Sequence, residues 1–216
     1  MKTLYESILD DYNTLSKNMD PNEPDRINIK GWIEENYSIA GTIDISKKPN
    51  KDGKYIVSCN GRLNLQNQES TSLTNGMFIF KFVKTFNCSH SQIENLEGAP
   101  TECEEFRCSG CQKLVNLVGS PKKLSSAMHC DNCYNLKSLE GCSRFVRNVY
   151  CSCCHSLETL QGVPKQVNEL YIDHCHNLKK ANIKMLPRSI YKCYCIDCSY
   201  SKQDIIKNSR VEDVVA

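Results

Sequence analysis

The segment CSGCQKLVNLVGSP (residues 108–121) decides how the rest of the chain is interpreted, because it recurs at a nearly fixed interval. CDNCYNLKSLEGCS begins at residue 130, CSCCHSLETLQGVP begins at residue 151, and CIDC follows from residue 195. Four glycines that close successive segments, Gly98, Gly119, Gly141 and Gly162, are 21, 22 and 21 residues apart. Such a period, sustained along a chain, is typical of a solenoid.

The repeating unit is Φ-x-C-x-x-C-x-x-L-x-x-L-x-G-x-P-x-x-Φ, in which Φ is apolar. The alternation Φ-x-C predicts a short strand with one buried face. Glycine and proline near the end of the unit predict a tight return. The inward column of these strands is predicted to be Phe86, Phe106, Met128, Val149, Leu170 and Cys193.

The two cysteines of each unit form separate columns. The first column contains Cys88, Cys108, Cys130, Cys151, Ile172 and Cys195. Ile172 indicates apolar packing, because a metal site would lose a ligand there while a buried cysteine behaves as a small apolar residue. The second column begins with Ser91 and continues with Cys111, Cys133, Cys154, Cys175 and Cys198.

This pattern resembles the leucine-rich-repeat family from about residue 86 to residue 198. With its MKTLYESILDD start and SLTNGMFIF lead-in, the whole chain resembles small cysteine-rich leucine-rich-repeat proteins of gut bacteria and their bacteriophages. The resemblance implies an α/β solenoid of short parallel strands with irregular return arcs. It also implies that the second column forms a structural ladder satisfying backbone groups, and that ligands bind on the concave strand face.

Three regions are expected. Residues 1–85 form a helical and β capping region, residues 86–198 form about six solenoid turns, and residues 199–216 form a C-terminal cap or tail. Helices are expected within residues 1–37, the second from about residue 25, and strands in SIAGTIDIS and KYIVSCNGRLNL. Ser201 and Asp204 predict a capping box for a short closing helix. Two extra residues between Leu178 and Pro187 predict a bulge in the fifth return.

Composition limits the class of protein. The chain has 216 residues, a net charge of +2 and 15 cysteines. The sequence shows no signal peptide and no stretch near the roughly 18 apolar residues of a membrane span. An odd cysteine count fits a fully paired disulfide framework badly. We therefore expect reduced thiols, a cytoplasmic location (the host cytoplasm if a phage encodes the protein), no membrane partner and no cofactor.

A binding row is predicted on the concave face. It consists of Arg107, His129, Tyr150, Tyr171 and Tyr194, with Asn87 before it and Ser109, Asp131, Ser152 and Asp173 as polar neighbours. Tyrosine and arginine are enriched at binding hot spots, although strand propensity and cross-strand stacking also favour tyrosine there. We predict a non-enzymatic module that binds a protein or peptide.

Two other functions stay open at this point. Paired C-x-x-C segments with His155, His174 and His176 nearby fit a zinc module, with nucleic-acid contact through Arg107, Arg144 and Arg147. A solenoid, however, stacks each cysteine column in a line instead of a tetrahedron, and the near-neutral charge does not indicate nucleic acid. A thiol enzyme is less favoured still, because adjacent Cys and His residues rarely face each other. No catalytic residue or metal ligand is assigned.

Overall fold

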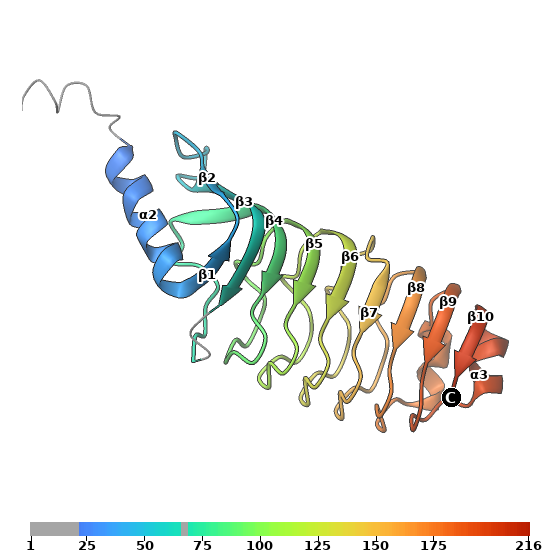
Figure 1. Cartoon of the computed structure of the whole chain (residues 1–216). Coiled ribbons are helices and arrows are strands. Elements are labelled where there is room, and N and C mark those ends of the chain that lie inside the picture. Colours follow the sequence, from blue (N-terminus) through green and yellow to red (C-terminus); the bar gives the residue numbers. More distant parts are fainter. Residues whose placement is uncertain (1–21, 66–68) are drawn as a thin grey trace, which may run out of the picture.

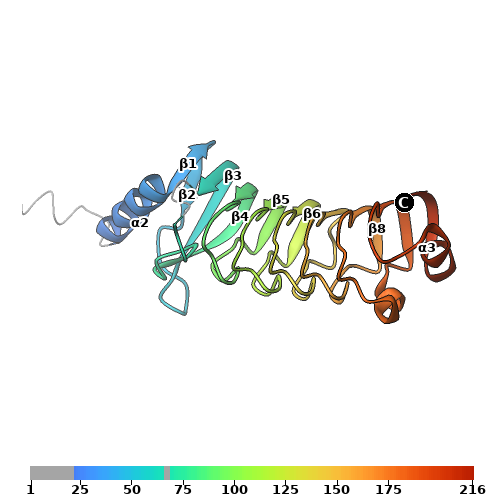
Figure 2. The ribbon, with the colours of Figure 1, turned by 90° about the horizontal axis from the view of Figure 1, so that it is seen from below.

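The computed structural model describes residues 22–65 and 69–216, and it is a β-solenoid of about eight turns (Figure 1). The described strands form one ten-stranded sheet in the order β1-β3-β4-β5-β6-β7-β8-β9-β10, with β2 also paired to β3. Every pairing from β3 to β10 is parallel, whereas β1 and β2 run antiparallel to β3. The strands lie on one side of the solenoid and the return segments on the other (Figure 2).

The helices within the described residues lie outside the sheet. They are α2 (Glu23–Asn36), the 3-10 helix η1 (Lys180–Met185) and α3 (Lys202–Asn208). The strands are β1 (Tyr37–Ala40), β2 (Ile43–Ile45), β3 (Tyr55–Leu65), β4 (Phe78–Asn87), β5 (Glu102–Arg107), β6 (Lys123–His129), β7 (Asn148–Tyr150), β8 (Gln166–Tyr171), β9 (Ser189–Tyr194) and β10 (Arg210–Val215). None of the described helices is long and apolar enough to cross a membrane.

The N-terminal end of the sheet is covered by α2, as expected from the sequence. Pro24 suits the first helical turn, where its missing N–H is not needed. The helix buries Ile29 and Ile33, and the part-buried Trp32 ring lies 5.7 Å from that of Phe78. The strands predicted in SIAGTIDIS and KYIVSCNGRLNL are present as β1, β2 and β3. The first helical segment expected from the sequence lies outside the described residues.

The solenoid extends beyond the six turns predicted for residues 86–198, because parallel strands continue at both ends. β3 lies within residues 1–85, β4 crosses the expected boundary and carries Phe86, and β10 lies within residues 199–216. Leu63 is in register with Phe86, and Val214 with Cys193, so other apolar residues extend the inward column. The cysteine signature therefore marks only part of the solenoid, since a buried column accepts any apolar side chain of suitable volume.

Each central turn buries the columns that the repeat predicts. In the turn that contains β6, Met128, Cys130, Cys133, Leu136 and Leu139 have no exposed surface. The same positions of neighbouring turns are equally buried, and together they form one core along the solenoid. Burial of about five apolar side chains per turn, at roughly 1.5–3 kcal/mol each, is the main term that holds the turns together.

Two local features make the return possible. The residue before the second-column position is left-handed in six successive turns: His90, Gly110, Asn132, Cys153, His174 and Asp197 have φ between 54° and 71°. The glycine near the end of the return is also left-handed, and at Gly162 (φ 98°) a Cβ would lie 2.1 Å from the carbonyl oxygen of Leu139 in the preceding turn. Glycine is required there by both conformation and space.

The C-terminal end agrees with the sequence expectations. The helix η1 occupies the predicted bulge between Leu178 and Pro187. Ser201 and Asp204 form the predicted capping box at the start of α3, with the Asp204 N–H donating to Ser201 Oγ. The final segment is a strand, β10, which pairs in parallel with β9.

Candidate functional site

The second cysteine column forms hydrogen bonds between successive turns. Thiols donate to carbonyl oxygens one turn back at 3.1–3.2 Å: Cys111 to Cys88, Cys133 to Cys108, Cys154 to Cys130 and Cys175 to Cys151. These four residues form the predicted cysteine ladder, which satisfies buried backbone acceptors. Cys198 departs from it and bonds the thiol of Cys195 and the carbonyl of Tyr200 instead, because the chain leaves the repeat there toward α3.

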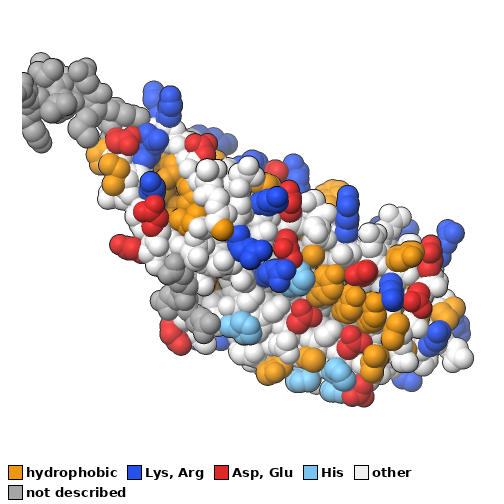
Figure 3. All heavy atoms as spheres, in the orientation of Figure 1, with side chains coloured by type: hydrophobic (Ala, Val, Ile, Leu, Met, Phe, Trp, Pro, Cys, Tyr) orange, Lys and Arg blue, Asp and Glu red, His pale blue; other side chains and the backbone are white. Residues whose placement is uncertain are grey.

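The predicted binding row is aligned in the sheet. Arg107 is in register with His129, His129 with Tyr150, Tyr150 with Tyr171, and Tyr171 with Tyr194. The four rings, which we call the ring row, stack on one another with centroid separations of 4.5, 4.7 and 4.0 Å. All are part-buried, and none of the helices within residues 22–65 and 69–216 covers this face (Figure 1). Hydrophobic side chains gather over β7 to β9 in Figure 3.

Charged neighbours orient the ring row. Arg107 donates to Glu105 Oε1 at 2.6 Å, and the same oxygen lies 2.9 Å from His129 Nε2. Burial and the nearby Arg107 charge lower the pKa of His129. At the other end, the Lys192 ammonium lies 4.9 Å from the centroid of the Tyr194 ring and lowers the pKa of that phenol. The row is therefore a set of rings with fixed orientations.

The predicted polar neighbours of the row bond mainly to each other. Ser109 Oγ donates to Asp131 Oδ2 at 3.5 Å, and Ser152 Oγ donates to Asp173 Oδ2 at 3.3 Å. The backbone N–H of Ser152 donates to the other oxygen of Asp131 at 3.0 Å. These side chains link successive turns, so their first role is in the fold.

A basic hollow lies at the start of strands β7 to β10 on the C-terminal half of the molecule. It has a volume of about 1170 Å³ and is lined by five basic side chains, Arg144, Arg147, Lys165, Arg188 and Arg210. None of the five forms an ion pair within the described part of the chain. Phe145 and Tyr191, which are 71% and 59% exposed, also line it. Only Arg144 and Arg147 were singled out from the sequence. Aligning the residues before each strand shows that the other three are also basic, but not that all five surround one hollow.

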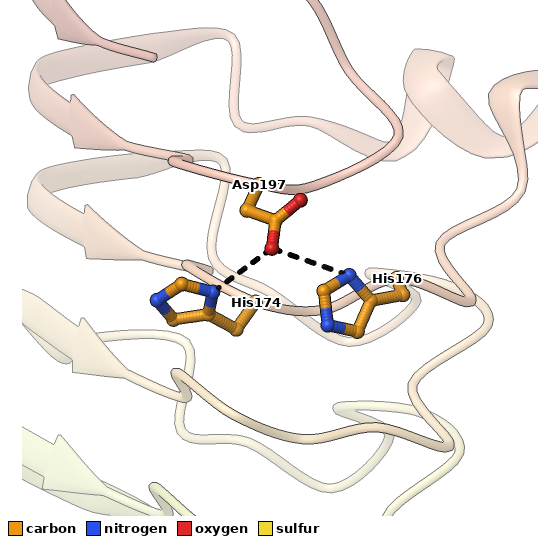
Figure 4. Close-up of side chains that lie close together, drawn as sticks. All are labelled: His174, His176 and Asp197. Carbon is orange, nitrogen blue, oxygen red and sulfur yellow. Dashed lines mark hydrogen bonds and ion pairs between the residues drawn. The ribbon is translucent and has the colours of Figure 1, made fainter.

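The potential metal ligands converge at a different place. His174, His176 and Asp197 are the only group of three or more such residues in residues 22–65 and 69–216 whose ligand atoms all lie within 4.8 Å of one another. Both imidazoles face one carboxylate oxygen, with Nδ1–Oδ2 distances of 3.3 and 3.9 Å (Figure 4). No cysteine belongs to this group, so the C-x-x-C spacing does not produce a zinc cluster in the described residues.

The thiols are poorly placed for nucleophilic chemistry. All fifteen cysteines are free, and only Cys153 and Cys198 are partly exposed. The ring of His155 lies 3.2 Å from the carbonyl of His174, and His174 contacts Asp197. In the described part of the chain, none of His155, His174 and His176 forms a hydrogen bond with a thiol.

Comparison with protein families, curated proteins and solved structures finds no match to this chain. The structure itself shows a β-solenoid with stacked cysteine columns. The leucine-rich-repeat likeness stays a resemblance in sequence pattern.

Proposed function

We propose that this protein is a non-enzymatic binding module that engages a protein or peptide through the ring row. The observation that carries the proposal is the stack of four rings, with Arg107 beside it, on a sheet face that none of the described helices covers. Tyrosine and arginine dominate binding hot spots because they combine apolar area with polar groups. Rings that are already held by their neighbours lose little conformational freedom on binding.

The length of the row indicates the kind of ligand. From Arg107 to Tyr194 there are four inter-strand steps, which span about 19 Å at the usual strand spacing. A surface of that length suits an extended peptide, a loop or one face of a helix. Glu105, Glu169 and Lys192 lie beside the row and would select polar groups at the edge of the contact.

Binding by paired variants tests this proposal. The partner would be captured from cells that encode the protein, purified, and titrated against Tyr150→Ala/Tyr171→Ala. We expect a loss of about 2 kcal/mol or more, because hot-spot residues carry most of the binding energy. The control is Lys137→Ala/Glu158→Ala on the return segments, where Glu158 forms an exposed ion pair with Lys179. Normal binding by the tyrosine variant with loss in the control would place the site on the return side.

The basic hollow favours a second candidate function, the binding of single-stranded nucleic acid. Unpaired arginines beside exposed rings are the combination that holds phosphates and stacked bases. Fluorescence anisotropy with a labelled oligonucleotide would measure this binding in wild type, Phe145→Ala and Arg188→Gln. Weaker binding in both variants and a strong salt dependence would support it. An affinity that neither substitution changes would exclude the basic hollow as the binding site for the oligonucleotide.

A further inference from the structure

We propose that His174, His176 and Asp197 form a Zn²⁺ site that links two successive turns near the C-terminal end of the solenoid. The two histidines follow β8, and Asp197 follows β9. The site is distinct from the ring row, from the basic hollow and from the cysteine columns. This proposal does not depend on the proposed binding function.

The distances within the group are close to those of zinc ligands. Zinc binds imidazole nitrogen at about 2.0–2.1 Å in a tetrahedral arrangement, which puts neighbouring ligand atoms about 3.3 Å apart. The two Nδ1–Oδ2 distances are 3.3 and 3.9 Å, and all the ligand atoms lie within 4.8 Å of one another. The three side chains are 48%, 51% and 65% exposed, so small rotations can bring them onto one ion.

The fold brings the three ligand-bearing positions together before any ion binds. His174 and Asp197 occupy the same left-handed position of two successive turns, with φ of 56° and 54°. The backbone N–H of His174 donates to the carbonyl of Ile196 at 2.9 Å, which fixes the spacing between these turns. The ring of His176 stacks on His155 with a centroid separation of 5.6 Å and an interplanar angle of 9°. This stacking restricts the orientation of the imidazole.

The donor set selects the type of ion. Imidazole nitrogens suit zinc and other late transition metals, whereas magnesium and calcium prefer sites made of oxygen. Two imidazoles and one carboxylate leave further coordination positions open to solvent, and no thiolate takes part. Exposed His–Asp ion pairs contribute little to stability, so a simple ion pair is the alternative that the experiment must separate.

Bound zinc would stabilise an end of the solenoid. Each turn of a solenoid contacts only its neighbours, so turns near the end depend on few interfaces. An ion that takes ligands from two turns binds the folded state and stabilises it. We therefore expect Zn²⁺ to raise the unfolding temperature and to slow hydrogen exchange in β9 and β10.

Calorimetric titration of the reduced, full-length protein with ZnCl₂ tests the site. We expect one equivalent to bind, and His174→Ala and Asp197→Asn each to weaken that binding by at least about tenfold, since even outer-shell changes cost that much. His90→Ala is the matched control, because His90 has the same turn position (φ 62°) in an earlier turn. Circular dichroism would show that these variants, all changed at exposed positions, keep the fold.

Cobalt distinguishes this site from the thiols. A Co²⁺ ion held by nitrogen and oxygen gives visible bands without the near-ultraviolet charge-transfer absorption of a thiolate complex. The proposal is overturned if no zinc binds, which would leave an ion pair only. It is also overturned if His174→Ala and Asp197→Asn bind zinc like wild type and cobalt shows thiolate absorption, which would place the metal on cysteines.

Discussion

The cysteine ladder inside the solenoid and the ring row on its strand face follow the same period but differ in what they allow. Inside, each position must fill a fixed volume and supply a donor to a backbone carbonyl, so Cys recurs from Cys111 to Cys175. Outside, only the spacing is fixed, and the row changes from Arg107 through His129 to tyrosines. The period therefore decides where side chains lie, while the identity of each side chain in the outer row is free to vary.

The exceptions inside the solenoid define what each column needs. Ile172 replaces a first-column cysteine and is fully buried, so that column requires apolar volume. Ser91 replaces a second-column cysteine and its hydroxyl donates to the Cys88 carbonyl at 2.6 Å, so that column requires a small donor. The two columns should respond differently to the same substitution.

The largest expected effect is at the close approach of two turns. Gly162→Ala should lower the free energy of unfolding by about 2–5 kcal/mol, because a left-handed alanine costs about 1–2 kcal/mol and overpacking about 1–3 kcal/mol. Gly53→Ala is the control, since Gly53 is left-handed but has nothing within 4 Å of an added Cβ. Gly53→Ala should lower the free energy of unfolding only by the conformational cost of a left-handed alanine, about 1–2 kcal/mol. Urea unfolding measures the free energy of unfolding of both variants. Equal losses would mean that the close contact between turns at Gly162 adds nothing to the cost of the substitution.

The next effect separates the two cysteine columns. Cys130→Ser should destabilise by about 1–3 kcal/mol, because it places a hydroxyl in the apolar first column. Cys133→Ser should cost less, since Ser91 shows that a hydroxyl finds a carbonyl in the second column. Cys153→Ser, at a part-exposed site, should stay within about 0.5 kcal/mol. A Cys133→Ser loss as large as that of Cys130→Ser would refute this division of roles.

Substitutions on the strand face should lower the free energy of unfolding by a smaller amount. Tyr171→Ala removes stacking on both sides, at 4.7 and 4.0 Å, and we expect a loss of about 1–2 kcal/mol, since aromatic pairs contribute about 0.5–1.5 kcal/mol each. Tyr191→Ala is the matched control, because this tyrosine lies in β9 outside the row and is 59% exposed. It should change stability by less than about 0.5 kcal/mol. Equal losses in thermal unfolding would argue that the row does not stabilise the sheet.

The smallest effect concerns the charge on His129. Burial and Arg107 lower its pKa, so the neutral imidazole is favoured in the folded state. The resulting stability is present above the ordinary imidazole pKa of about 6.5 and is lost as pH falls through that value toward the folded pKa. NMR titration should show a pKa that Arg107→Gln raises and Glu105→Gln lowers further. A pKa above the ordinary value in wild type would contradict this assignment.

Much of the site could be predicted from the repeat because its neighbours are one period apart. The inward column, the ring row and the cysteine ladder up to Cys175 all lie in the predicted register. The departure of Cys198 could not be predicted, because it depends on the path of the chain toward α3. The turn at β3 was missed because it continues the inward column with Leu63 and has no C-x-x-C pair. The last turn, at β10, lies in the segment that was expected to be a cap or tail.

The sequence by itself determined the period, the direction in which each strand side chain points, and hence the stacked columns. These follow from the alternation along a strand and the fixed spacing between strands. Only the tertiary structure decided that five basic side chains surround one hollow and that His174, His176 and Asp197 face a common point. Those arrangements depend on how the return segments bend and on the rotamers of exposed side chains. Neither is set by the residue spacing, because exposed side chains are not constrained by packing.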